Sequence, residues 1–557
     1  MRGPRRMERK LWYPFYDPGV DLSPIYTDIP LKEQFISLVK KQPNKPYIYY
    51  LNKIITYYEA NTSACRLANA MLDMGIKKGD RVVINLPNMP EFLIAAHACF
   101  KIGAIVVPTN PRYTKRELLC QYLNCKAETI ICLDLNLNLN CEILLENQDV
   151  LKRIIVVSTQ NPPFKVQEKE FLIMYKDLVE KGREAEPEEE ALLDDIGLII
   201  YTGGTTGVGK GCCITNFNLI AMASGWKQMC QYFVNLENYK VLSSTPMYHI
   251  HGFQTTFNAN ILIGGSIIIM PEITPDNILE AVNQYEPNVW LGVPALIGAL
   301  CLHPKLAESK MNKLQHIGCG ASSIPMSIMD KFESIVGVPI IEGYGASETS
   351  MAVASNPMTK RKAGSVGIPY PNTDCKVVDI VTGTKEVPLG QVGELCFKGP
   401  QIVKEYWQNP KETALNFQEG WWHSGDIGYM DEEGFIFILD RKKDMIICSG
   451  FNVYCSEVEN ILNSHPQILE AAVIGVPDLK RGETVKAYVV IKSGEKVSDL
   501  AIKDFCRKYL AAYKLPNEVE FINALPRTSV HKINRKALRA LNSNRMKGFD
   551  SLEGGFK

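Results

Sequence analysis

The chain has 557 residues, more than one hydrophobic core usually organises, so at least two domains are expected. Hydrophobic residues make up 46% and charged residues 22%, as in ordinary globular proteins. Lys plus Arg equals Asp plus Glu, 61 each, so no net charge draws the chain to nucleic acid or to an anionic membrane, and DNA binding is disfavoured as its main task.

The first ten residues are basic, but no long apolar core follows them, so they do not form a secretory signal. The longest apolar stretch, 92–107, contains His97 and Lys101 and is too short to span a bilayer. We therefore expect a cytoplasmic protein without a transmembrane segment; peripheral membrane contact and oligomeric state stay open. The sixteen cysteines include no CxxC pair, which favours reduced, mostly buried thiols over a zinc or redox site.

Helices and strands alternate through the first 200 residues. Apolar residues at helical spacing occupy 67–74, and the apolar run 80–86 then predicts a buried strand. The pattern repeats with a helix at 90–99 and a strand at 104–107. Further strands are predicted at 129–132, 153–157 and 197–201. This βαβ order predicts an α/β fold in which parallel or mixed sheets are layered with helices.

Two later stretches indicate how the rest of the chain is organised. The run 180–190 is charged and contains a proline, which predicts a solvated linker. A strand is predicted at 434–439, and after residue 440 a fresh set of alternating elements is long enough for a small α+β domain. We therefore predict a large N-terminal domain over residues 1–440 and a small C-terminal domain over residues 441–557.

A segment rich in glycine and threonine, YTGGTTGVGKG at 201–211, directly follows the strand predicted at 197–201. Glycines let backbone amides close on an anion, threonine hydroxyls add donors, and Lys210 adds a positive charge, so the segment predicts phosphate binding. From Gly204 to Lys210 it satisfies the GxxxxGK part of a P-loop. Gly211, however, occupies the position where a P-loop NTPase needs Ser or Thr to hold magnesium. A P-loop NTPase is therefore only the second interpretation of this segment.

Read whole, this segment resembles the signature of the adenylate-forming superfamily, which includes acyl-CoA synthetases, firefly luciferase and the adenylation domains of peptide synthetases. Further segments resemble that superfamily's motifs in the same order, and the resemblance extends from about residue 26 to residue 538. These segments are PMYHIHG at 246–252, GYGASE at 343–348, WWHSGD at 421–426, DRKKD at 440–444 with GFNV at 450–453, and PRTSVHKI at 526–533.

The resemblance implies an AMP-forming acyl-CoA synthetase. Such an enzyme activates a carboxylic acid with ATP as its acyl-adenylate, releases pyrophosphate, and then transfers the acyl group to coenzyme A. Lys532 would contact the α-phosphate and the acyl carboxylate, where its charge stabilises the adenylation step. Glu348 and Thr206 would hold Mg²⁺, Asp426 would accept hydrogen bonds from the ribose hydroxyls, and His249 would line the acyl channel.

The resemblance also implies that the small domain is mobile and pivots at Lys443 between the two half-reactions. The residues that it places at the cofactors are Thr202, Gly203, Gly204, Thr205, Thr206, Gly207, Lys210, Gly320, Ala321, Ser322, Glu342, Gly343, Tyr344, Gly345, Ser347, Asp426, Arg441, Lys443, Ser449, Gly450 and Asn452.

Three positions depart from the superfamily's usual motifs. Gly203 replaces a serine and Gly209 a proline, and both changes should loosen the phosphate loop and weaken its hold. His531 replaces the glycine that usually precedes the catalytic lysine, which would cost roughly 1 kcal/mol if that position needs a positive φ.

The acid itself is suggested by two segments. Residues 440–457 are most similar to the corresponding loop of medium- and long-chain fatty-acid–CoA ligases, with Cys455 where those enzymes have proline. Residues 252–254 read Gly-Phe-Gln and lack the Phe-Asp pair that binds a substrate amino group, so an uncharged pocket for an acyl or aryl acid is expected. Aryl-acid–CoA ligases stay a close alternative. Luciferase-type oxygenation has no support, and a non-catalytic nucleotide-binding regulator is disfavoured because Lys532, Glu348 and Asp426 are all present.

Overall fold

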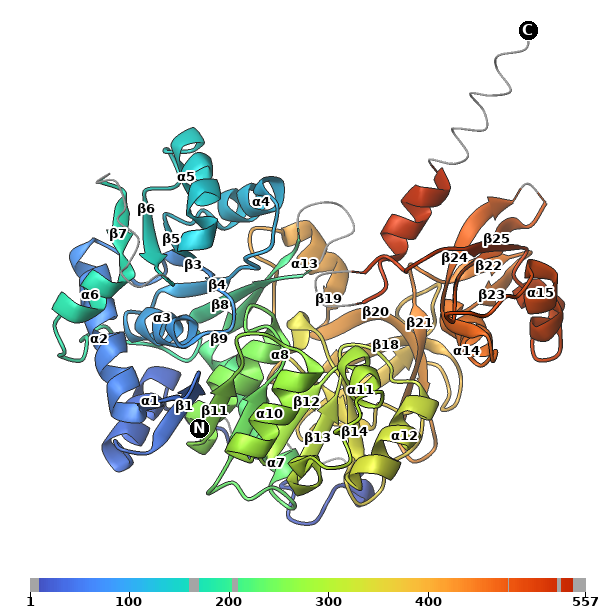
Figure 1. Cartoon of the computed structure of the whole chain (residues 1–557), viewed down its shortest axis with the longest axis horizontal. Coiled ribbons are helices and arrows are strands. Elements are labelled where there is room, and N and C mark those ends of the chain that lie inside the picture. The colour runs from blue at the N-terminus through green and yellow to red at the C-terminus, as the bar shows by residue number, and fades with distance from the viewer. Residues whose placement is uncertain (1–9, 160–169, 203–208, 479, 528–531, 544–557) are drawn as a thin grey trace, which may run out of the picture. The chain divides into compact units, whose positions relative to one another are not determined.

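The computed structural model describes residues 10–159, 170–202, 209–478, 480–527 and 532–543 (Figure 1). The chain divides into two compact units. The first contains Met1–Cys375, Phe397–Trp422 and Glu433–Phe435, and the second contains Lys376–Cys396, His423–Glu432 and Ile436–Lys557. The predicted division at residue 440 stays a prediction, and the units are described one at a time.

A seven-stranded sheet in the first unit confirms the predicted βαβ alternation. Its strands follow the order β7-β6-β5-β3-β4-β8-β9, and every neighbouring pair is parallel except β8 and β9. The strands are β3 (Arg81–Asn85), β4 (Ile105–Pro108), β5 (Thr129–Leu133), β6 (Arg153–Val157), β7 (Leu172–Met174), β8 (Ile196–Tyr201) and β9 (Gly211–Thr215).

A nine-stranded sheet, in the order β16-β15-β14-β13-β12-β10-β11-β1-β2, forms the other half of this unit. Its central pairs are parallel, and its edge strands β2, β15 and β16 are antiparallel to their neighbours. The strands are β1 (Pro46–Tyr50), β2 (Lys53–Thr56), β10 (Lys240–Ser243), β11 (Ser266–Ile269), β12 (Val289–Gly292), β13 (His316–Cys319), β14 (Ile340–Tyr344), β15 (Ala354–Ser355) and β16 (Ile368–Pro369).

Helices cover both faces of each sheet because successive strand residues point to opposite sides. In β3, Val83 packs in the cluster with α4 and α5, whereas Val82 and Ile84 pack in the cluster with α2, α3 and α7. Figure 1 shows α4 and α5 on one side of the seven-stranded sheet and α2 and α3 on the other. The cluster of α2, α3 and α7 also contains residues of the nine-stranded sheet, whose far face is covered by α10, α11 and α12.

The helices of the first unit are α1 (Leu31–Lys41), α2 (Tyr57–Asp73), α3 (Pro90–Lys101), α4 (Lys115–Cys125), α5 (Leu137–Glu146), α6 (Tyr175–Lys181), α7 (Asn216–Cys230), α8 (Ile250–Phe253), the π-helical η3 (Gln254–Asn258), α9 (Ala259–Ile263), α10 (Pro275–Tyr285), α11 (Pro294–Leu300), α12 (Met326–Val336) and α13 (Pro410–Asn416), with 3₁₀ turns η1 (Tyr13–Phe15), η2 (Asp134–Asn136), η4 (Lys310–Lys313) and η5 (Ser347–Thr349).

The charged run 180–190 is not a freely solvated linker, so that prediction was wrong. Glu186 forms an ion pair of 2.6 Å with Lys101, whose side chain is only 2% exposed. Lys32 Nζ donates hydrogen bonds to the carbonyls of Pro187 and Glu189. A buried cation needs partners of this kind, and the charged run supplies them. The segment therefore ties α1 and α3 together.

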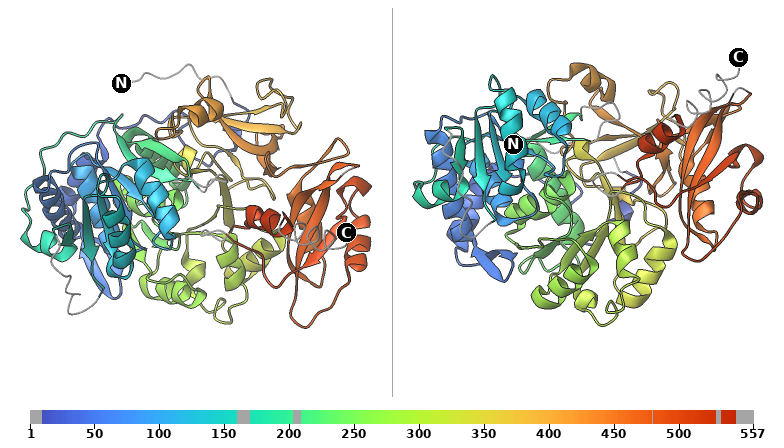
Figure 2. Two further views of the ribbon diagram at one scale, coloured as in Figure 1. Left: turned by 90° about the horizontal axis from the view of Figure 1, so that it is seen from above. Right: turned by 45° about the horizontal axis from the view of Figure 1, so that its top comes forward.

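The second unit contains a sheet in the order β23-β22-β25-β24, with β26 parallel to β25. Its core is formed with α14 and α15 and is drawn in orange and red in Figure 2. These elements are β22 (Ile446–Cys448), β23 (Phe451–Val453), α14 (Cys455–Asn463), β24 (Ile468–Asp478), β25 (Gly482–Ile491), α15 (Asp499–Arg507), η6 (Ala512–Lys514) and β26 (Glu518–Phe521).

A further five-stranded sheet has the order β17-β18-β20-β19, with β21 beside β20. Its strands are β17 (Asp374–Val378), β18 (Gly393–Lys398), β19 (Phe417–Gln418), β20 (Trp421–Met430) and β21 (Ile436–Arg441). All sixteen cysteines are free thiols, as predicted. Among the helices of the described residues, none combines the length and the apolar character that crossing a membrane requires.

Candidate active site

The predicted phosphate loop connects two antiparallel strands, β8 and β9. Its ends are joined by a hydrogen bond of 2.9 Å from the Thr202 N–H to the Lys210 carbonyl. A Cβ atom added to Gly209 would lie 2.3 Å from the Thr202 carbonyl oxygen, so this backbone leaves no room for the usual proline. The predicted contacts Gly203, Gly204, Thr205, Thr206 and Gly207 lie outside the described residues.

Lys210 and Glu348 are connected through a tyrosine that the motifs do not contain. Tyr406 donates a hydrogen bond of 2.8 Å from its hydroxyl to Oε1 of Glu348. Lys210 Nζ lies 4.9 Å from the centre of the Tyr406 ring and 2.6 Å from Oε2 of Glu412. The side chain of Tyr406 therefore contacts both Lys210, which is expected to bind the phosphates, and Glu348, which is expected to bind Mg²⁺.

Backbone pairing with β9 places Tyr406 here. The Cys213 N–H donates to the Glu405 carbonyl at 3.2 Å, and the Trp407 N–H donates to the Gly211 carbonyl at 2.7 Å. Burial, followed by the negative charge of Glu348, raises the pKa of Tyr406, so its hydroxyl keeps its proton and acts as a donor. Sequence reasoning missed Tyr406 and Glu412 because neither residue belongs to a recognised motif or to a periodic pattern.

The neighbouring parallel strands β13 and β14 end at two further predicted segments. Gly320, Ala321 and Ser322 follow β13, and the run from Glu342 to Gly345 lies at the end of β14. A Cβ on Gly345 would lie 1.8 Å from the Met351 carbonyl oxygen, so only glycine fits there. Ligands commonly bind at the carboxyl ends of parallel strands, which suits the predicted cofactor contacts of these residues.

Glu342 is a buried carboxyl group in this region. Burial raises its pKa to about 7, although a backbone hydrogen bond from Ile324 and the charge of Arg361 act in the opposite direction. The group therefore changes charge close to neutral pH.

The remaining predicted residues of the first unit flank these segments. Ser347 and Glu348 belong to the 3₁₀ turn η5, two residues after Gly345, and the ring centres of Tyr344 and Phe397 are 5.6 Å apart. His249 is the N-cap residue of α8, and its ring lies 4.8 Å from that of Tyr248.

In the second unit, Asp426, Arg441 and Lys532 come together. Arg441 Nε lies 2.6 Å from Oδ1 of the buried Asp426, and the two residues are paired across β20 and β21. Lys532 has a solvent-exposed side chain, yet the surrounding protein and the charge of Arg441 lower its pKa while Asp426 raises it. The predicted ribose ligand and the predicted catalytic lysine thus influence each other electrostatically.

The hinge candidate Lys443 follows a firmly held residue. Lys442 donates from its backbone N–H to the Gly425 carbonyl at 2.8 Å and from Nζ to Glu394 at 2.8 Å. Burial raises the pKa of Glu394, but the neighbouring His423 and Lys442 side chains outweigh it and lower the pKa to about 2. Burial lowers the pKa of Lys443 itself. Sequence reasoning missed Glu394 and its partners.

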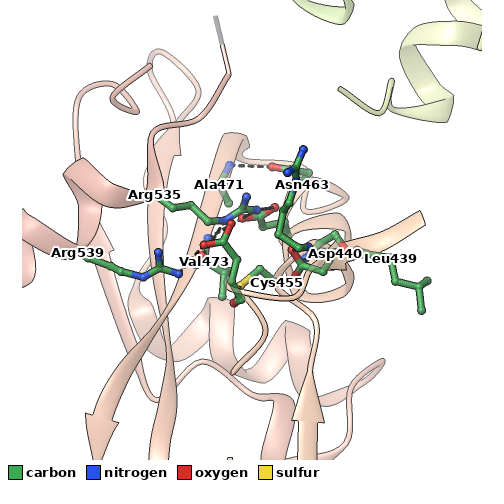
Figure 3. Close-up of polar contacts among 12 residues, drawn as sticks. Leu439, Asp440, Cys455, Asn463, Ala471, Val473, Arg535 and Arg539 are labelled. Carbon is green, nitrogen blue, oxygen red and sulfur yellow. Dashed lines mark hydrogen bonds and ion pairs between the residues drawn. The ribbon is translucent and has the colours of Figure 1, made fainter. Parts of the chain in front are cut away.

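A polar network anchors the chain on the C-terminal side of Lys532. Arg535 donates to both carboxylate oxygens of Glu459 at 2.7 Å, and Arg539 donates to Oδ1 of Asp444 at 2.7 Å. Figure 3 shows both arginines directed toward the cluster around Val473 and Cys455. Hydrogen bonds between charged arginine and carboxylate groups are among the stronger ones, so the segment that carries Lys532 is held against the residues that follow the hinge.

Ser449, Gly450 and Asn452 belong to the hairpin between β22 and β23. Cys448 pairs with Phe451, and the two loop residues have φ values of +51° and +82°. Positive φ at both positions is the signature of a type I′ turn, which explains the glycine on structural grounds.

Comparisons with known proteins identify the family to which the chain belongs. Residues 35–407 match the model of a family described as AMP-binding enzyme, and residues 457–532 match that of the AMP-binding enzyme C-terminal domain. The chain is 37% identical to a long-chain-fatty-acid–CoA ligase of Bacillus subtilis (strain 168), over 89% of this chain and 91% of the relative. It is 29% identical to a feruloyl-CoA synthase of an Amycolatopsis species, over 90% of this chain and 96% of the relative.

Solved structures are similar over nearly the whole chain. The structure of ATP-bound MatB from Rhodopseudomonas palustris has a TM-score of 0.84 at 28% identity and covers 92% of this chain and 99% of its own. The o-succinylbenzoate CoA synthetase of Bacillus subtilis, in complex with its acyl-adenylate intermediate, has a TM-score of 0.79 at 26% identity and covers 92% of this chain and 98% of its own.

Proposed function

Because the chain belongs to the family of AMP-binding enzymes and is an AMP-forming acyl-CoA synthetase, we propose that its acid substrate is a medium- or long-chain fatty acid. ATP and coenzyme A are its co-substrates. The proposal on the acid is supported by the relative named as a long-chain-fatty-acid–CoA ligase and by the absence of a charged partner for a substrate amino group at 252–254.

The reaction has two steps in which the proposed residues act. A carboxylate oxygen of the acid attacks the α-phosphorus of ATP, and the bond to pyrophosphate breaks. The thiol of coenzyme A then attacks the acyl carbon and AMP leaves. We assign Lys532 to the first step, where an ammonium group can offset the charge that builds up on the phosphoryl oxygens. Lys210 would hold the outer phosphates and Asp426 the ribose hydroxyls.

Glu348 is proposed to hold the Mg²⁺ that accompanies ATP. Within the described part of the chain no group of three or more His, Cys, Asp or Glu side chains is positioned to bind a metal ion. A single carboxylate beside a phosphate-binding lysine nevertheless suits Mg²⁺, which usually binds through one or two carboxylates together with substrate phosphates. The ion would neutralise phosphate charge, and Tyr406 would orient the carboxylate that binds it.

The observation that carries the proposal on the acid is the 37% identity to a long-chain-fatty-acid–CoA ligase over 89% of this chain. The contacts of Tyr406 with Lys210 and Glu348 support the proposed nucleotide and Mg²⁺ site. The test is ATP–pyrophosphate exchange with saturated fatty acids of increasing length, and with benzoic and cinnamic acids as the aryl series. Exchange that is highest with medium or long fatty acids would support the proposal. Exchange confined to the aryl series would contradict it.

An aryl acid is the second candidate. The feruloyl-CoA synthase and the o-succinylbenzoate CoA synthetase resemble the chain over nine-tenths of its length, so the fold and motifs are compatible with aromatic acids too.

A further inference from the structure

A narrow slot lies between α7 and the helical segment that follows His249. It is bounded by Met222 and Trp226 of α7, by Gln254 and Thr255 of η3, and by Met351. The empty space is about 170 Å³, openings to solvent included, and it is too narrow to admit a water molecule.

Two of the segments that line the slot are close in sequence to residues of the proposed site. The helical segment 250–263 begins directly after His249, and Met351 lies three residues after Glu348. A ligand could enter only if side chains move, and the unbranched Met351 is well suited to that. The slot is therefore where we expect the hydrocarbon part of the acid.

One lining side chain, Gln254, has an amide NH₂ group without a hydrogen-bond partner among the described residues. Asn258 Nδ2 donates to the Leu219 carbonyl at 2.6 Å, which fixes which end of the Asn258 amide is the nitrogen. The same Nδ2 donates to Oε1 of Gln254, which fixes the Gln254 amide in turn. If the Gln254 amide were flipped, its NH₂ group would face the NH₂ group of Asn258. Oε1 of Gln254 therefore faces Asn258, and Nε2 points away from it.

Gln254 is only 2% exposed, and its Nε2 is buried. Within the part of the chain that the structure describes, this nitrogen has no hydrogen-bond partner. The other polar groups of the lining are already engaged. Thr255 Oγ1 donates to the His251 carbonyl at 2.9 Å, and Trp226 Nε1 donates to the Tyr239 hydroxyl at 3.2 Å. Buried polar groups in native proteins are nearly always paired, so this one calls for an external acceptor.

We propose that Gln254 is a specificity-determining residue and that the acid carries a hydrogen-bond-accepting oxygen (a hydroxyl, keto or ether group) on its hydrocarbon part. The inference rests on the proposed function and narrows it from fatty acids in general to oxygenated ones. Gln254 lies five residues after His249, or about 7 Å of helical rise, so the oxygen is several carbon–carbon bonds away from the carboxylate.

The test compares dodecanoic acid with its hydroxy and keto derivatives, the oxygen being moved stepwise along the chain, by ATP–pyrophosphate exchange. For the best-placed oxygen we expect kcat/KM at least roughly tenfold above that of dodecanoic acid, because a buried donor is satisfied only by the oxygenated acid. Gln254→Met keeps the length of the side chain and removes the donor. It should abolish this preference and improve the plain acid.

Thr255→Val is the matched control, since it changes a lining hydroxyl that is already bonded within the helix, and it should keep the preference ratio. Thermal unfolding checks that both variants fold. If Gln254→Met does not fold, the inference is judged by the ratio of kcat/KM for oxygenated and plain acids in the parent enzyme. Equal kcat/KM for plain and oxygenated acids would overturn the inference while leaving the proposed fatty-acid activity intact. Exchange with none of these acids would instead contradict the proposed function.

Discussion

The hydroxyl of Tyr406 donates a hydrogen bond of 2.8 Å to Oε1 of Glu348, although the two residues are 58 positions apart in the chain. The bond fixes one oxygen of the carboxylate that we assign to Mg²⁺. The same tyrosine ring lies beside Lys210. A substitution at Tyr406 should therefore affect both Mg²⁺ binding and phosphate binding.

Tyr406→Phe removes this donor and keeps the ring. We expect the Mg²⁺ concentration for half-maximal adenylation to rise by roughly 10–100-fold, the usual effect of losing a residue that orients a metal ligand. Magnesium titration of pyrophosphate exchange measures it. Tyr232→Phe, at a tyrosine that is 55% exposed, is the matched control and should behave as the parent. An unchanged magnesium requirement in Tyr406→Phe would remove the tyrosine from this role.

Lys532→Ala should separate the two half-reactions. Loss of the ammonium group should slow acyl-adenylate formation by roughly 10³–10⁵, the range for charge stabilisation in phosphoryl transfer. Conversion of pre-formed acyl-adenylate to acyl-CoA should persist. Lys536→Ala, at an exposed lysine on the same segment, should preserve both rates. Equal losses in both steps would show that Lys532 is not specific to adenylation.

Lys443→Pro tests the proposed hinge. Proline fixes φ near −65° and should hamper a rotation at this residue. The neighbouring turn bond, from the Asp444 N–H to the Arg441 carbonyl at 2.9 Å, does not involve the nitrogen of residue 443. Pyrophosphate exchange should survive while acyl-CoA formation collapses, and Lys443→Ala should spare both. A normal thioester rate in the proline variant would exclude a hinge at this position.

Glu342 should make stability depend on pH. Its pKa is raised from 4.5 to about 7, so between these values the folded protein keeps a proton that the unfolded chain has lost. The free energy of unfolding therefore falls as pH rises through this window. Glu342→Gln cannot titrate, and relative to the parent it should gain roughly 1–3 kcal/mol between pH 4.5 and pH 7. Denaturant unfolding at both pH values checks this; a constant difference between the two proteins would argue against it.

His531 is addressed by sequence alone, because it lies outside the described residues. We predict that His531→Gly, which restores the usual residue, supports adenylation at least as well as the parent. If the histidine instead donates to the phosphates, parental activity should weaken above its ordinary pKa of about 6.5. Exchange rates of both proteins across this pH range distinguish these cases. A large loss in the glycine variant without pH dependence would contradict both.

Much of the fold could be predicted because local patterns determine it. The alternating apolar runs correctly located β3, β4, β5, β6 and β8, each within a residue or so of its observed bounds. The prediction for the charged run 180–190 was wrong because the composition of the run does not reveal its partners. These are the buried ammonium groups of Lys32 and Lys101, to which the run supplies hydrogen-bond acceptors and a carboxylate. The contacts of Tyr406 were equally out of reach, since they depend on a non-local pairing with β9. Motif-based assignments such as Lys532 and Asp426 stay predictions of role, although the structure brings these two residues into one neighbourhood.

The most direct test of the central claim is the fate of ATP in a single turnover with purified protein, a fatty acid and Mg²⁺. We expect stoichiometric pyrophosphate and acyl-adenylate before coenzyme A is added. Once it is added, AMP and acyl-CoA should appear in equal amounts, as mass spectrometry would show. Release of ADP and phosphate, or nucleotide cleavage that does not depend on the acid, would contradict it.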